Sequence, residues 1–206
     1  MIKINNEIKN LNIEDVYVEC GLNNDSLFID LGANTGQQVK YLTEKRVGTI
    51  IAFEPHPIIY SELVANCPPS ESLQCYQMAA WIRDEKRNLF FKNSPRQING
   101  GSSLIYEKTN IDRSAAFVVE CIDFSKFLFD LDKDVSVLKV DIEGSEYHLI
   151  SHLINSGAIN YVKNIFVEDH ERKIESGTVF YGDYIQKRKF VLDFFRDSKI
   201  DYYSWK

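Results

Sequence analysis

Residues 26–46 have the pattern of a short buried strand, a glycine-containing turn and a helix. The strand segment, residues 26–31, is apolar apart from Ser26 and Asp30, the turn reads Gly-Ala-Asn-Thr-Gly, and helical spacing continues to about Arg46. In this order the three elements are typical of a nucleotide-binding α/β unit. Because a strand followed by a helix commonly leads into a second, parallel strand, the segment predicts a parallel sheet with helices packed on it.

Strands and helices keep alternating through the rest of the chain. Further strands are predicted at residues 47–53, 73–78, 135–141, 161–168 and 201–205, and helices at residues 57–67, 124–131, 145–155 and 184–195. Residues 88–92 and 117–121 are predicted to form an antiparallel pair around an insertion, residues 93–116. We therefore expect a single α/β domain over residues 1–206, with a mainly parallel sheet, helices on both faces and an N-terminal extension at residues 1–25.

Composition excludes several classes of function. The chain is 44% hydrophobic and 26% charged, as in ordinary globular proteins, and its formal net charge is −6. Such a chain has no general positive field for a nucleic-acid backbone, so nucleic acid is not expected as a partner. The apolar stretch at residues 47–53 is too short to span a membrane, and residues 1–10 are too polar for a signal peptide. We expect a soluble, cytoplasmic protein whose oligomeric state the sequence leaves open.

Four predicted strands end in polar clusters, at residues 30–37, 54–56, 141–146 and 168–170. In parallel α/β sheets, ligands bind beyond the carboxyl ends of the strands. These clusters are therefore predicted to line one crevice.

The turn departs from the pattern that binds a dinucleotide. Asn34 and Gln37 occupy the second and third glycine positions of Gly-x-Gly-x-x-Gly, where close approach to a pyrophosphate requires glycine. Glu54, 22 residues after Gly32, suits the two hydroxyls of a ribose and would repel a 2′-phosphate. A cofactor with adenosine and an amino acid fits better. A nicotinamide-dependent reductase and a noncatalytic nucleotide-binding scaffold of the same fold remain alternatives.

Six segments together resemble the FkbM-type S-adenosylmethionine-dependent methyltransferases. They are FIDLGANTGQ at residues 28–37, FEP at 53–55, MAAW at 78–81, GSSL at 101–104, LKVDIEGSE at 138–146 and VEDH at 167–170. The resemblance implies a class I methyltransferase fold, which is Rossmann-like, with S-adenosylmethionine as cofactor. It also implies O-methylation, usually of a hydroxyl on a sugar, a glycan or a secondary metabolite.

The resemblance also implies a set of cofactor-binding residues. Asp30, Gly32 and Asn34 would line the methionine half of the cofactor, and Glu54 would bind its ribose. Trp81 is a candidate for stacking on the adenine. The implied cofactor-binding residues are Asp30, Gly32, Ala33, Asn34, Gly36, Gln37, Glu54, Pro55, Met78, Ala79, Ala80, Trp81 and Asp141.

A hydroxyl acceptor needs a base or a metal ion, because it is a poor nucleophile at neutral pH. His170 is the first candidate for the base, because its ordinary pKa lies near neutral pH and an adjacent carboxylate can orient it, and Asp141 or Glu143 is the second. The candidate catalytic residues are His170, Asp141, Glu143, Glu168 and Lys139. Mg²⁺ is the alternative activator, with candidate ligands Asp141, Glu143, Glu168 and Asp169.

Other polar residues receive more limited interpretations. Glu146, at a predicted helix start, is expected to complement the helix dipole. His148 and His152 are four residues apart, but no Glu follows His148, so no zinc site is predicted there.

The acceptor is expected at the insertion, residues 93–116, which is longer than ordinary connections and contains Gly100-Gly101-Ser102-Ser103. Candidate acceptor contacts in this loop or lid are Arg96, Asn99, Ser102, Ser103 and Tyr106.

The carboxyl end departs from the family pattern, which usually closes with a crossover strand and a reversed strand. Only residues 201–205 look like a strand there, so we expect a sheet that is shortened or completed by residues 178–181.

Overall fold

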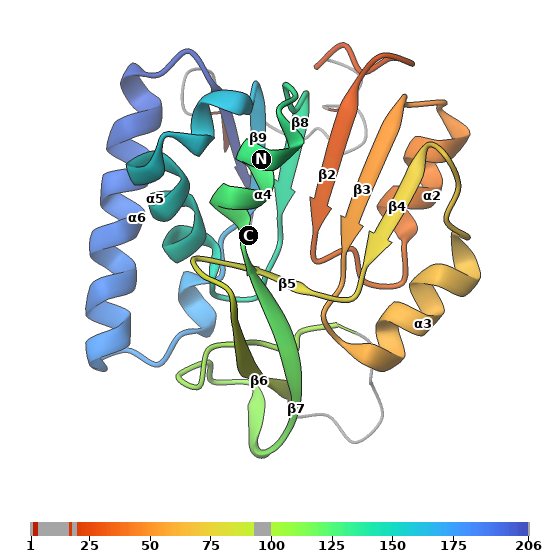
Figure 1. Cartoon of the computed structure of the whole chain (residues 1–206). Helices are drawn as coiled ribbons and strands as arrows, with labels where there is room; N and C mark the ends of the chain where they lie inside the picture. The colour runs from red at the N-terminus through yellow and green to blue at the C-terminus, as the bar shows by residue number, and fades with distance from the viewer. Residues whose placement is uncertain (1, 4–16, 18–19, 93–99, 206) are drawn as a thin grey trace.

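The structure, a computed structural model, describes residues 2–3, 17, 20–92 and 100–205. A seven-stranded sheet lies at its centre (Figure 1). Its strands follow the order β1 (Ile2–Lys3), β10 (Asp201–Trp205), β9 (Asn164–Glu168), β8 (Val137–Val140), β2 (Leu27–Leu31), β3 (Thr49–Phe53) and β4 (Leu73–Tyr76). All neighbours run parallel except β1, which is antiparallel to β10. The predicted α/β fold with a mainly parallel sheet is confirmed.

Helices cover both faces of this sheet (Figure 1). One face carries α2 (Gln37–Glu44) and α3 (Pro57–Asn66), and the other carries α4 (Phe124–Leu131), α5 (Glu146–Ser156) and α6 (Val179–Asp197). Alternate residues of β2 enter the two layers, because side chains of a strand point to opposite faces. Ile29 and Leu31 pack with α4, α5 and α6, whereas Phe28 packs with α2 and α3. The central strand is therefore buried on both sides.

The carboxyl end differs from the prediction at one place. Residues 178–181, expected to complete the sheet, are the start of α6, where the Thr178 hydroxyl accepts a hydrogen bond from the Tyr181 amide at 3.0 Å. This helix cap competes with an extended conformation, because it satisfies an amide that a helix end leaves free. On this side of the sheet β10 is the last parallel strand, and β1 lies beyond it as the antiparallel edge strand.

A second sheet of three strands lies beyond the carboxyl ends of β2 and β3 (Figure 1). It contains β5 (Ala79–Trp81), β7 (Ile111–Asp123) and β6 (Glu85–Lys92), in that order. The predicted antiparallel pair is confirmed as the β6–β7 hairpin, and β5 runs parallel to β7. Residues 111–116, expected in the insertion, belong to β7. Residues 93–99, with Arg96 and Asn99, lie outside the described residues.

None of the helices in the described ranges combines the length and the apolar character needed to cross a membrane.

The N-terminus of α4 offers a test of local stability. The Asp123 carboxylate accepts hydrogen bonds from the amides of Ser125 and Lys126, at 3.1 and 3.4 Å. Asp123→Ala removes this cap and is expected to lower the free energy of unfolding by about 1–2 kcal/mol, measured by urea denaturation. The control is Asp130→Ala, an exposed residue of the same helix, which is expected to change stability by less than about 0.5 kcal/mol. Equal losses in both variants would contradict the assignment of the cap.

Candidate active site

A pocket lies at the carboxyl ends of β2, β3 and β8, with a volume of about 660 Å³ that includes space open to solvent. Nine of its lining residues were predicted as site residues: Gly32, Asn34, Glu54, Pro55, Met78, Ala79, Ala80, Asp141 and Glu143. Phe53, Ile59, Leu89 and Leu104 add an apolar wall, and the loop at residues 100–102 forms another side. The structure therefore brings the first three predicted clusters together in one crevice.

Gly32 allows the turn after β2 to pass close to the loop after β8. Its φ is +80°, and a Cβ atom built on it would lie 1.9 Å from the backbone oxygen of Asp141. That separation is far below van der Waals contact, so any other residue would push the two loops apart. Asn34, in the same turn, also has a positive φ, of 51°. Strained backbone of this kind persists only where surrounding contacts hold it.

Glu54 holds this turn from the neighbouring strand. One carboxylate oxygen accepts a hydrogen bond from the Asn34 amide and the other accepts one from the His56 amide, each at 2.9 Å. Each oxygen keeps a lone pair for a further donor. Burial raises the pKa of Glu54 to about 7, against the opposing effect of the two amides. The side chain is thus fixed in the pocket wall with room to accept from two hydroxyls.

Asp30 and Lys139 form a buried ion pair below the pocket instead of lining it. The Lys139 ammonium lies 2.8 Å from Asp30, donates to the Gly32 carbonyl at 3.1 Å and lies 3.6 Å from Asp141. Burial disfavours its charge, but Asp30 and Asp141 outweigh that effect and hold the pKa of Lys139 above its usual range. Lys139 therefore stays charged and positions the two loops; it has no free lone pair for a proton.

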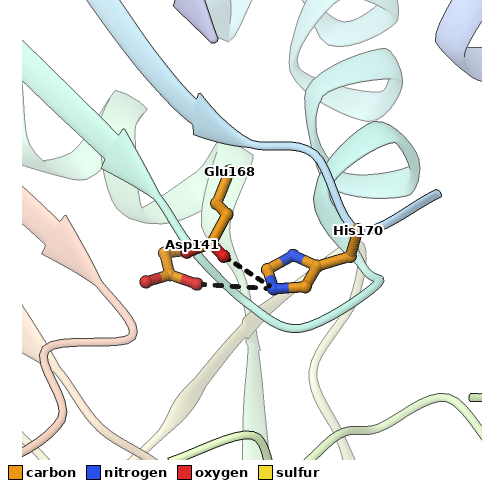
Figure 2. Close-up of side chains that lie close together, drawn as sticks. All are labelled: Asp141, Glu168 and His170. Atoms are coloured by element: carbon orange, nitrogen blue, oxygen red, sulfur yellow. Dashed lines mark ion pairs between the residues drawn. The ribbon is translucent and has the colours of Figure 1, made fainter. Parts of the chain in front are cut away.

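The fourth predicted cluster lies beside Asp141, centred on His170 (Figure 2). The His170 Nδ1 atom lies 2.8 Å from a Glu146 oxygen. Its Nε2 atom lies 3.1 Å from Glu143, 3.4 Å from Glu168 and 4.0 Å from Asp141. Figure 2 shows Asp141 and Glu168 pointing toward Nε2 from the ends of neighbouring strands.

The surroundings of His170 argue against its predicted role as the base. Burial lowers its pKa, but Glu146 and Glu143 raise it more strongly, to about 10. In this state both ring nitrogens carry protons at neutral pH, and a cationic imidazole cannot accept another. The side chain is also fully buried, whereas those of Asp141 and Glu168 are 25% and 24% exposed. The carboxylates of Asp141 and Glu168 are therefore better placed than His170 to contact a substrate and accept its proton.

Two residues of this site were not identified as such from the sequence. Glu146 was expected only to complement a helix dipole, but its buried carboxylate accepts hydrogen bonds from the amides of Ile142 and Gly144 as well as holding His170. Lys108, in the insertion, pairs with Glu143 and donates to the Gly101 carbonyl at 2.7 Å. An acidic residue at a helix start and a lone lysine are common on protein surfaces, so nothing in the sequence indicated that these two side chains are buried.

Glu143 joins the insertion to the loop after β8. Its φ is 56°, in the left-handed region, and its backbone oxygen accepts a hydrogen bond from the Ser103 hydroxyl at 2.6 Å. Burial opposes its charge, but His170 and Lys108 hold the pKa of Glu143 well below its usual range. Ser103 is thus a buried structural residue, while Tyr106 is exposed and Ser102 lines the pocket.

Several predicted site residues lie away from the pocket. Trp81 is buried, donates to Glu85 at 2.9 Å and carries the Arg87 guanidinium over its ring at 4.6 Å, so this position does not fit adenine stacking in the pocket. Asp169 pairs with Arg188 at 2.9 Å, apart from the proposed Mg²⁺ ligands. Besides Asp30, the other predicted cofactor-binding residues outside the pocket lining are Ala33, Gly36 and Gln37, which belong to the turn and the start of α2.

The two histidines of α5 lie apart from the His170 cluster, and each pairs with a different carboxylate. His148 lies 2.8 Å from Asp183, and His152 lies 3.0 Å from Asp123.

Comparison with known proteins identifies the family. The Methyltransferase FkbM domain matches residues 30–197, which include the pocket and the His170 cluster. The chain belongs to the FkbM methyltransferase family. A relative in Beauveria bassiana (strain ARSEF 2860), named Methyltransferase 1, is 28% identical over 180 residues, which cover 78% of this chain and 71% of the relative. No solved structure matches the chain.

Two glycines give a matched test of the close approach in this FkbM methyltransferase fold. Gly32 and Gly177 have φ values of +80° and +83°, but a Cβ atom on Gly177 would meet nothing within 4 Å. Gly177→Ala is expected to cost only the backbone strain, about 1–2 kcal/mol of unfolding free energy. Gly32→Ala adds a clash with a backbone oxygen and is expected to cost about 1–3 kcal/mol more. Similar losses in both variants, measured by denaturation, would show that the loops separate freely.

Proposed function

We propose that this protein transfers a methyl group from S-adenosylmethionine to a hydroxyl of a sugar, a glycan or a secondary metabolite. The observation that carries the proposal is the charge of the pocket wall. Among the described residues that line it, Glu54, Asp141 and Glu143 are acidic, and none is a lysine or an arginine. A wall of this charge favours a cationic sulfonium cofactor and disfavours the pyrophosphate of a nicotinamide dinucleotide.

The lining residues also fit the other parts of this cofactor. Glu54 keeps a lone pair on each carboxylate oxygen, which suits the two hydroxyls of a ribose. Met78, Ala79 and Leu89 offer an apolar surface for a planar base. Gly32 and Asn34 remain candidates for the methionine half, whereas Asp30 would act on it only through Lys139.

When bound, the cofactor supplies an electrophilic methyl group, which the acceptor oxygen takes as it loses its proton. Asp141 lines the pocket, and Glu168 lies beside it at the end of the next strand. Their partly exposed carboxylates would accept that proton. His170 would act as a buried cation that holds Glu143 and Glu146 in place. The protein's main contribution would be to position the two reactants.

A polyhydroxylated acceptor is supported by an open groove that shares Leu104 with the pocket. Phe90 and Tyr106 line this groove together with the charged residues Arg87 and Glu107. Aromatic rings next to hydrogen-bonding groups suit a sugar, which has apolar faces and polar edges. The identity of the acceptor and a cytoplasmic location stay predictions.

Cofactor binding is expected to depend on pH through Glu54. Its pKa is about 7, and only its ionised form accepts from both hydroxyls of a ribose without a competing proton. The affinity for S-adenosylhomocysteine, measured by calorimetry, should therefore rise between about pH 6 and 8. In Glu54→Gln this rise should disappear, and Glu54→Ala should bind at least about 10-fold more weakly.

The control for this experiment is Glu71→Gln, an exposed glutamate in the turn before β4, which should behave as the unmodified protein. Binding of NAD in place of S-adenosylhomocysteine would overturn the cofactor assignment, and unchanged affinity in Glu54→Ala would overturn the role of Glu54.

Methyl transfer is tested with labelled S-adenosylmethionine and a panel of sugars, glycans and secondary metabolites. With an acceptor found, Glu168→Gln is expected to lower the maximal rate about 10²–10⁴-fold, because it removes a carboxylate beside the acceptor. Affinity for S-adenosylhomocysteine should change only a few-fold, since Glu168 does not line the pocket. A normal rate in Glu168→Gln would contradict this role.

A further inference from the structure

We propose that Asp141, Glu168 and His170 bind a divalent transition-metal ion, such as Mn²⁺, at the edge of the pocket. These residues come from the ends of the adjacent strands β8 and β9 and from the turn that follows β9. Figure 2 shows the two carboxylates and the imidazole converging on one point. The proposal concerns binding of the ion and stands whether or not the methyl donor has been identified.

The spacing of the three groups fits one ion. One ligand atom from each residue lies within 4.8 Å of the others. His170 Nε2 is 3.4 Å from a Glu168 oxygen and 4.0 Å from an Asp141 oxygen. Two atoms that each lie about 2.1 Å from a metal ion are roughly 3.0 to 4.2 Å apart, depending on the angle between them. Both separations from His170 Nε2 fall in this range.

The imidazole supplies the second, independent observation. His170 Nε2 is buried and makes no hydrogen bond, although carboxylates lie within ion-pair distance. Its other nitrogen is held by Glu146, whose carboxylate is fixed in turn by the amides of Ile142 and Gly144. Binding of the ion would displace the proton on Nε2, while the proton on Nδ1 stays with Glu146, and the freed lone pair of Nε2 would face Asp141 and Glu168. A carboxylate behind a histidine is the usual support of a metal-binding imidazole.

The charge of the cluster also favours a divalent cation. Apart from His170, its charged groups are the carboxylates of Asp30, Asp141, Glu143, Glu146 and Glu168 and the ammonium groups of Lys108, Lys139 and Lys173. Among these described residues, the acidic groups outnumber the lysines by two. A proton on His170 balances one of these charges, whereas one divalent ion balances both.

The ligand types distinguish this site from the Mg²⁺ site predicted from the sequence. Two of the four carboxylates predicted for Mg²⁺ have other partners, since Asp169 binds Arg188 and Glu143 binds Lys108. An imidazole replaces them, and nitrogen ligands favour first-row transition ions over Mg²⁺. Asp141 and Glu168 are partly exposed, so the ion would keep open positions on the pocket side. If the proposed function holds, one of these positions would bind and orient the acceptor hydroxyl.

The test is a titration of the metal-free full chain with Mn²⁺, in which free Mn²⁺ is measured by electron paramagnetic resonance. We expect one ion per chain, with saturation below about 1 mM Mn²⁺. His170→Gln and Glu168→Gln should each weaken binding at least about 10-fold. The matched control is His152→Gln, which removes a carboxylate-paired histidine elsewhere on the fold and should bind Mn²⁺ normally.

Absence of binding to the unmodified chain at about 1 mM Mn²⁺ would overturn the proposal. Unchanged affinity in Glu168→Gln would do the same, and this partly exposed residue can be replaced with less risk to folding than the buried His170. Circular dichroism of each variant checks the fold. Displacement of Mn²⁺ by an equal concentration of Mg²⁺ would overturn the preference for a transition ion. The titration contains neither a methyl donor nor an acceptor, so a failure to bind Mn²⁺ would not affect the tests of the proposed function.

Discussion

The buried ion pair between Asp30 and Lys139 connects the parts of the molecule on which the candidate site depends. The two residues are direct neighbours on the central strands β2 and β8, and their side chains meet inside the fold at 2.8 Å. Lys139 also donates to the Gly32 carbonyl and lies near Asp141. Removing either partner would leave a buried charge unpaired, at a cost of about 3–5 kcal/mol. The pair therefore holds the turn after β2 and the loop after β8 at one separation, which Gly32 makes short.

Asp141 lies where two differently charged environments meet. On one side is the pocket, whose described lining residues include acids but no basic side chain. On the other side is the His170 cluster, in which lysines and the imidazole compensate a group of carboxylates. Glu143 spans both, since it lines the pocket and pairs with Lys108. A change of charge in the His170 cluster would thus alter the electrostatic potential at the pocket wall, because Asp141 and Glu143 belong to both.

Much of the fold could be predicted because its elements are encoded locally. The strands at residues 27–31 and 137–140 are apolar apart from Asp30 and Lys139, and α4 was predicted with its observed bounds from the spacing of its apolar residues. The short strand β5 was missed, because Ala79–Trp81 pairs only with the distant β7. For residues 178–181 the error came from a local interaction. Their β-branched and aromatic residues indicate a strand, but the hydrogen bond to the Thr178 side chain starts a helix there.

The candidate site likewise has features that the sequence predicts locally and features that depend on the tertiary structure. The sequence by itself determined the strand–turn–helix unit, the acidic residue at the end of β3 and the polar clusters that parallel strands must bring to one edge. Only the tertiary structure decided what these residues can do there. It turned Trp81 toward Arg87, buried Asp30 against Lys139 and surrounded His170 with Glu143, Glu146 and Glu168. The protonation of a histidine depends on burial and on charges that are distant in the chain, so a sequence read locally assigns it an ordinary pKa where the fold raises it to about 10.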